Sequence, residues 1–74
     1  MLLNEYLRFK RINNNLSLND VAKKIGCSKQ NLSQIELGVI SLGIKSLDKI
    51  SAVYGQNSKE FILEFEEFNK GLKK

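Results

Sequence analysis

The chain has 74 residues, of which 42% are hydrophobic, with a net charge of +4, one cysteine and no histidine. A chain of this length forms one domain at most and leaves little room for a catalytic cleft beside its core. A single cysteine excludes an intramolecular disulfide, and the lack of histidine excludes the ordinary zinc sites and Cys–His catalysis. We therefore expect no enzyme activity, no cofactor and no metal site.

The excess positive charge lies in the first part of the sequence. Residues 1–57 contain eight Lys and Arg and four acidic residues, whereas residues 58–74 contain four Lys and four Glu. A basic body with a neutral C-terminal part is compatible with binding to a polyanion. No segment approaches the roughly 20 apolar residues of a membrane span, so we expect a cytoplasmic protein without a membrane partner.

Five helices are predicted in chain order, because proline is absent and β-branched residues are sparse. The first helix runs from about residue 2 to 13 and carries an inward apolar stripe, and a run of three asparagines ends it. The second helix follows Ser17, which is expected to act as its N-cap together with Asp20 three residues later. Gly26 is expected to end this helix.

Three further helices are predicted in the second half of the sequence. Ser28 is expected to cap the third helix and Gly38 to close it; the fourth covers about residues 45–54. The fifth helix is expected to start at a Ser58 cap and to extend over about residues 58–72. Apolar residues at helical spacing predict the core of helices two to five. These predicted core residues are Val21, Ala22, Ile25, Leu32, Ile35, Leu47, Ile50, Val53, Phe61 and Ile62.

The most informative segment, residues 17–37, consists of two short amphipathic helices joined by Gly26-Cys27-Ser28. A small residue in the first helix, Ala22, and a glycine in the turn allow two helices to cross closely at a wide angle. Cys27 is expected to be a small residue that packs in the turn. The outer face of the second helix is polar and could be ordinary solvated surface, but its side chains can also hydrogen-bond base edges. The candidate base-contacting residues are Lys29, Gln30, Ser33 and Gln34.

With these features the sequence resembles the Cro/repressor (XRE-type) helix-turn-helix family of phage and bacterial regulators. The resemblance covers roughly residues 3–62. It implies an all-α, five-helix, lambda-repressor-like domain in which the third helix lies in the major groove of double-stranded DNA. The positions that carry the resemblance are Leu16-Ser17, Ala22, Ile25-Gly26, Leu32, Ile35-Glu36-Leu37-Gly38, Leu47 and Ile50.

The resemblance also assigns roles to polar residues outside the base-contacting face. It implies that Ser17 and Asn31 contact phosphates, together with the N-terminal amides of the second helix. Lys10 and Arg11 are expected to be further phosphate contacts. Arg11 also matches the first-helix arginine that pairs with a glutamate in this family, which is Glu36 here, and the pair would fix helix one against helix three.

Two departures from the family pattern weaken the expected phosphate contacts. The family commonly has a phosphate-binding glutamine at the start of the second helix, where this sequence has Leu18. The loop after the third helix is often basic in the family, whereas residues 37–43 are mainly apolar here. Val39, Ile40 and Leu42 in this loop either cap the domain's own core or form a dimer interface.

Aromatic residues of the fifth helix offer a second candidate dimer interface. Phe61, Phe65, Phe68 and Leu72 follow a heptad-like spacing. We expect Phe65 and Phe68 to contact a second subunit, with packing on the domain's own core as the alternative. Small restriction–modification controller proteins have a similar layout, including a stretch like residues 44–47, and this resemblance suggests a short dimeric regulator.

The sequence therefore predicts a sequence-specific transcriptional regulator, either a repressor or a repressor/activator, that binds a DNA operator as a symmetric homodimer. No small-molecule ligand is expected, because the chain has no room for a sensor domain. The alternative is a protein-interaction module, such as an antirepressor or an assembly subunit, with weak or no DNA binding. Leu18 and the apolar loop favour this alternative, and the salt dependence of binding distinguishes the two.

Overall fold

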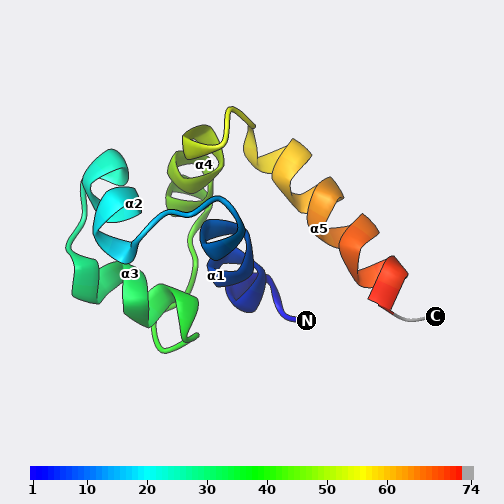
Figure 1. The fold of residues 1–74 in the computed structure, drawn as a ribbon, viewed down its shortest axis with the longest axis horizontal. Helices are drawn as coiled ribbons and strands as arrows, with labels where there is room; N and C mark the ends of the chain where they lie inside the picture. Colours follow the sequence, from blue (N-terminus) through cyan, green and yellow to red (C-terminus); the bar gives the residue numbers. More distant parts are fainter. Residues whose placement is uncertain (73–74) are drawn as a thin grey trace.

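The computed structural model describes residues 1–72, which form five helices and no strand (Figure 1). α2 packs against α3 and α4, α1 packs against α3, and α5 packs against α4. None of the helices in this part of the chain is long and apolar enough to cross a membrane. The predicted all-α, repressor-like arrangement is confirmed. The helices are α1 (Leu3–Asn13), α2 (Leu18–Ile25), α3 (Lys29–Glu36), α4 (Ile44–Val53) and α5 (Ser58–Leu72).

Local hydrogen bonds set the start and end of α2. The Ser17 hydroxyl accepts a bond from the Asp20 amide at 3.0 Å, and the Ser17 amide donates to Asp20 Oδ2 at 2.8 Å. This reciprocal pair satisfies two amide groups that lack partners within the helix. At the other end Gly26 has a φ of 75°, a left-handed conformation that glycine adopts without a steric cost. The short α2 is therefore fixed at both ends by residues of its own segment.

The cap of α5 differs from the sequence prediction. Asn57, and not Ser58, precedes the helix as its N-cap: the Glu60 amide donates to Asn57 Oδ1 at 2.8 Å, and the Asn57 amide donates to Glu60 Oε1 at 3.0 Å. Ser58 is the first helical residue. Both residue types are favoured caps, and the glutamate three residues after Asn57 decides between them because it completes the reciprocal bond.

The core lies where α2, α3, α4 and the first turn of α5 meet the inner face of α1. Most of the predicted core residues are buried there, while Val53 and Ile62 are half-buried and pack against it. Ser51 is a buried polar residue that the apolar pattern did not predict. Its hydroxyl donates to the Leu47 carbonyl at 2.7 Å, so its burial leaves no hydrogen bond unmade.

An aromatic cluster joins α5 to α1. The Tyr6 ring lies 5.4 Å from the ring of Phe65 and 5.3 Å from that of Phe68, and Phe68 is also 4.8 Å from Phe9. Phe65 and Phe68 are half-buried within their own chain. Both phenylalanines therefore pack on their own chain, as the alternative states, and contact of their remaining accessible surface with a second subunit stays a prediction. The side chain of Leu72, predicted to continue the stripe, lies outside the described part of the structure.

A polar cluster beside the aromatic one also holds α5 against α1. Glu64 accepts hydrogen bonds from Lys10 Nζ at 2.5 Å, from Gln56 Nε2 at 3.1 Å and from the Tyr6 hydroxyl. Burial alone would raise the pKa of Glu64, but the bonds from Lys10, Tyr6 and Gln56 outweigh it and hold this pKa below its ordinary value. Burial and the bond to Glu64 raise the pKa of Tyr6. The cluster therefore keeps Glu64 ionised and Tyr6 neutral.

Candidate nucleic-acid interface

The α2–α3 pair forms a compact unit at one end of the molecule (Figure 1). Ala22 of α2 is almost completely buried, and the Cys27 amide donates to the Ala22 carbonyl at 3.0 Å across the turn. The Ser28 hydroxyl accepts from the Asn31 amide at 3.1 Å and starts α3. These contacts give the two helices a fixed crossing, with α3 along the outer edge of the domain.

The four predicted base-contacting side chains line one hollow on the protein surface. Lys29, Gln30, Ser33 and Gln34 form its α3 side, and Leu18, the first residue of α2, completes it. Lys29, Gln30 and Gln34 are exposed, whereas Ser33 and Leu18 are half-buried. The outer face of α3 thus combines a cation, two amides and a hydroxyl next to one aliphatic group. The sequence had marked Leu18 only as a departure from a family pattern, without placing it in this surface.

The predicted phosphate contacts Ser17 and Asn31 do not line this hollow, although each is next in sequence to a residue that does. Both residues are exposed. The Ser17 hydroxyl accepts the Asp20 amide at 3.0 Å. Bonds from the Ser17 amide and hydroxyl lower the pKa of Asp20, so an ionised carboxylate stands at the N-terminus of α2. This negative charge opposes an incoming phosphate at the same helix end.

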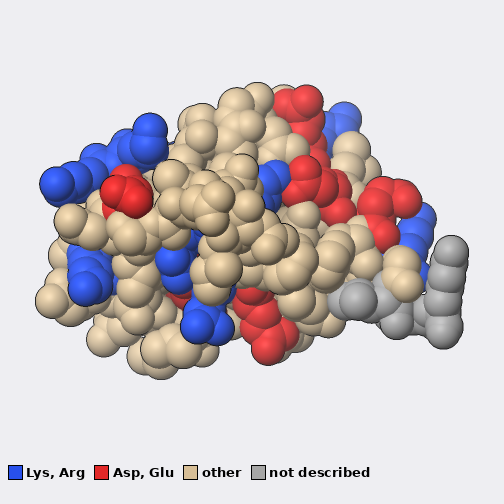
Figure 2. All heavy atoms as spheres, in the orientation of Figure 1, with Lys and Arg blue, Asp and Glu red and all other residues tan. Residues whose placement is uncertain are grey.

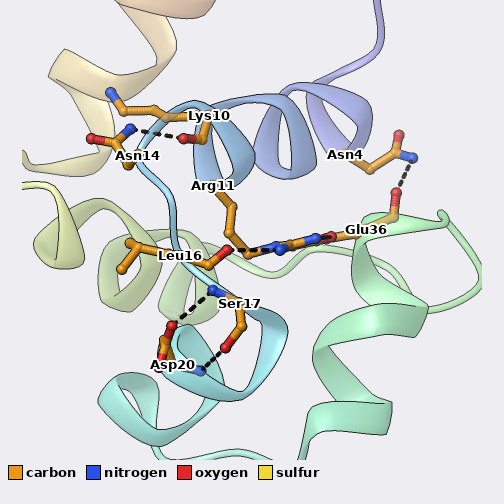
Figure 3. A network of polar contacts seen from close by, with 8 residues as sticks. All are labelled: Asn4, Lys10, Arg11, Asn14, Leu16, Ser17, Asp20 and Glu36. Atoms are coloured by element: carbon orange, nitrogen blue, oxygen red, sulfur yellow. Dashed lines mark hydrogen bonds and ion pairs between the residues drawn. The ribbon is translucent and has the colours of Figure 1, made fainter.

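Arg11 and Glu36 form a buried ion pair between α1 and α3 (Figure 3). Arg11 Nε donates to one carboxylate oxygen of Glu36 at 2.8 Å, and the terminal guanidinium nitrogen Nη2 donates to the other at 3.1 Å. The remaining terminal nitrogen, Nη1, donates to the Leu16 carbonyl at 2.9 Å. One side chain of α1 therefore holds both the end of α3 and the segment that leads into α2.

The geometry of Arg11 and Lys10 differs from the expectation that they contact phosphates. Arg11 is only 8% exposed, and both faces of its guanidinium fork are occupied by protein acceptors. The Lys10 side chain is 12% exposed and meets Glu64 of α5 and Gln56, which precedes this helix. Neither cation is free to meet DNA, so neither belongs to the nucleic-acid interface.

Exposed charges of opposite sign gather at opposite ends of the molecule. α2 and α3 together carry three exposed lysines and one exposed acid, because Glu36 is buried and neutralised by Arg11. α5 carries four glutamates and two lysines. On the face drawn in Figure 2, Lys and Arg dominate the α2–α3 end, and Asp and Glu collect over α5. A polyanion would therefore meet the domain at the α2–α3 end.

The segment that follows α3 forms an exposed apolar patch. Leu37, Val39, Ile40 and Ile44, which we call the loop patch, are 69%, 71%, 38% and 79% exposed. Leu42, predicted to share this surface, is half-buried and packs against the core. Leu37 and Ile44 are additional members that the sequence prediction did not include. Ile40 and Ile44 line the same hollow beside the start of α1.

The end of α3 is tied to α1 in a way that fixes the start of this loop. Asn4 Nδ2 donates to the Glu36 carbonyl at 3.0 Å (Figure 3). Gly38 follows with a φ of 79°, and a Cβ atom at this position would lie 3.1 Å from Asn4 Nδ2. Both the backbone conformation and the close approach favour glycine, so the loop leaves α3 in one direction.

A bundle in which the second helix of a tight helix–turn–helix unit presents hydrogen-bonding side chains at a basic end has the architecture of a DNA-binding domain. The sequence matches the model of the family described as Helix-turn-helix over residues 7–61, and the chain belongs to this family. The match confirms the resemblance to Cro/repressor (XRE-type) regulators and shows a DNA-binding regulator of that kind. Comparisons with curated proteins and with solved structures gave no match.

Proposed function

We propose that the protein is a sequence-specific transcriptional regulator that reads an operator with α3 and binds it as a symmetric homodimer. The observation that carries the proposal is the single surface formed by Lys29, Gln30, Ser33 and Gln34. Lysine pairs with guanine, glutamine with adenine, and serine with either base, so this surface has the chemistry of the major groove. Occupation of a promoter by such a dimer would repress it, and contact with polymerase from an upstream site would activate it.

Ser17 and Asn31 are proposed as phosphate contacts that set the position of α3 in the groove. Both are exposed, and each is next in sequence to a residue of the proposed reading surface, which is the hollow lined by α3 and Leu18. The first-turn amides of α2 have no acceptors within their own helix. These anchors are few and mostly neutral, and Asp20 adds a negative charge beside them. Affinity per subunit is therefore low, and the operator is held by two subunits together.

The loop patch is the proposed dimer interface. Exposed apolar residues that gather on one segment can mark a site of association. In this chain the exposed apolar residues adjoin the C-terminal end of α3, so pairing through them would place two reading helices on the same side of the dimer. Half-sites about one helical turn apart, roughly 34 Å, are expected for such a dimer.

Selection of duplexes from a randomised pool, followed by sequencing, tests the proposal because the protein itself picks out its operator. The expected result is a two-fold symmetric motif whose binding constant falls steeply as salt rises.

Sedimentation across a concentration series tests the dimer: Ile44→Lys is expected to shift the equilibrium to monomer. The matched control Leu63→Lys alters another exposed aliphatic residue, on α5, and is expected to leave the dimer intact. Dissociation by Leu63→Lys alone would place the interface on α5.

One observation favours a second candidate function. The loop patch and Leu18 are apolar where the family commonly has polar or basic residues, which suits a module that binds protein. An antirepressor or assembly subunit of this kind would show weak or no DNA binding. If the pool yields no enriched duplex and no duplex binds at low salt, this second function replaces the first.

A further inference from the structure

The hollow on the proposed reading surface contains one side chain that cannot make hydrogen bonds. Leu18 lies at the start of α2, across from the polar residues of α3 that share the hollow. Part of its side chain packs on the core, which holds it in place, and part remains accessible in the hollow. Lys, Gln and Ser side chains can hydrogen-bond to base edges. These hydrogen bonds leave the fixed aliphatic group of Leu18 without a partner on the DNA.

The major groove offers one kind of apolar group at base edges. Each base pair presents hydrogen-bond donors and acceptors there, and thymine adds a C5-methyl group. If Leu18 packed against a hydrogen-bond donor or acceptor of a base, that polar group would lose its water without gaining a new hydrogen bond, which is unfavourable. Leu18 against a methyl group buries apolar surface on both sides and is favourable.

We propose that Leu18 selects a thymine in each half-site by contact with its 5-methyl group, next to the bases that α3 reads. Leu18 is then a specificity-determining residue of the operator complex. Apolar contact at this point also accounts for a leucine where a phosphate-binding side chain would otherwise stand. The inference rests on the proposed function, because it needs α3 in the major groove.

The test uses a duplex that the protein itself has selected, with each thymine replaced in turn by uracil, which keeps the pairing and removes only the methyl group. One thymine per half-site is expected to lose about fourfold in affinity on this replacement, the factor that corresponds to burial of one methyl-sized group. In Leu18→Ala the same replacement is expected to have no further effect. In Leu18→Met, which keeps an aliphatic side chain, the sensitivity to uracil is expected to remain.

Two controls separate this contact from a folding defect. Leu63→Ala removes an exposed leucine of α5 outside the hollow, and it is expected to keep both the affinity and the sensitivity to uracil. The uracil series on the unaltered protein needs no variant, so it stands even if Leu18→Ala unfolds. A selected duplex with no sensitive thymine, or a thymine whose sensitivity persists in folded Leu18→Ala, would overturn the inference while the proposed function stands. If no duplex is selected, the proposed function fails and the inference fails with it.

Discussion

Arg11→Met should leave Glu36 as a buried carboxylate without its partner, which is expected to be strongly destabilising. The two side chains are 10% and 5% exposed, so water cannot replace the lost bonds. Removal of one partner of a buried ion pair costs about 3–5 kcal/mol. A domain of this size is stabilised by only about 4–11 kcal/mol in total, from roughly 0.05–0.15 kcal/mol per residue. The variant is therefore expected to be close to unfolded at physiological temperature.

The double variant Arg11→Met/Glu36→Leu provides the matched comparison. It removes both charges, so it avoids an uncompensated buried carboxylate and is expected to be more stable than Arg11→Met alone. Urea denaturation followed by circular dichroism gives the free energy of unfolding of each protein. A loss below about 1 kcal/mol in Arg11→Met, which is in the range of an exposed pair, would refute the assignment of a buried structural pair. So would a double variant that is less stable than the single one.

Glu64→Gln is expected to flatten the loss of stability in acid. The folded protein holds the pKa of Glu64 below its ordinary value of about 4.3. The ionised carboxylate therefore stabilises the fold at pH values above this ordinary pKa, and the contribution is lost as the pH falls through the lower pKa of the folded state. An unchanged pH profile of urea denaturation in Glu64→Gln would contradict this. Gly38→Ala is expected to cost about 1–2 kcal/mol from its positive φ, whereas Gly43→Ala, with a φ of −81° and open space around it, is expected to be nearly neutral. Asn57→Ala is expected to cost about 1 kcal/mol and Ser58→Ala much less, because Asn57 is the cap of α5; thermal denaturation that ranks these two in the reverse order would make Ser58 the cap.

The sequence predicted well those features that depend on short separations along the chain. The Ser17–Asp20 cap, the left-handed Gly26 and the apolar spacing of α2 and α3 all involve residues within a few positions of one another. The polar face of α3 was predictable for the same reason, because helical spacing alone places Gln30 and Ser33 on one side. Local chemistry therefore defined both the helix-turn-helix unit and the polar surface of α3.

Features that depend on long separations were predicted less well. Heptad-like spacing indicated that Phe68 faces a partner, but could not say that the partner is Tyr6 of the same chain, 62 positions away. Lys10 was predicted to contact a phosphate, whereas its side chain meets Glu64, 54 positions away in the sequence. The surroundings of Leu18 likewise became visible only when α2 and α3 were placed side by side.

The most direct test of base reading by α3 compares the affinity of Gln30→Ala/Ser33→Ala for the selected duplex with its affinity for a scrambled duplex of equal length. Loss of base contacts worth about 1–3 kcal/mol each is expected to reduce the preference for the selected duplex by roughly five- to 150-fold per contact. Salt-dependent binding to the scrambled duplex should persist, because phosphate contacts are kept. Lys59→Ala on α5 serves as a control and should change neither value. An unchanged preference in a folded double variant would contradict the claim that α3 reads the operator.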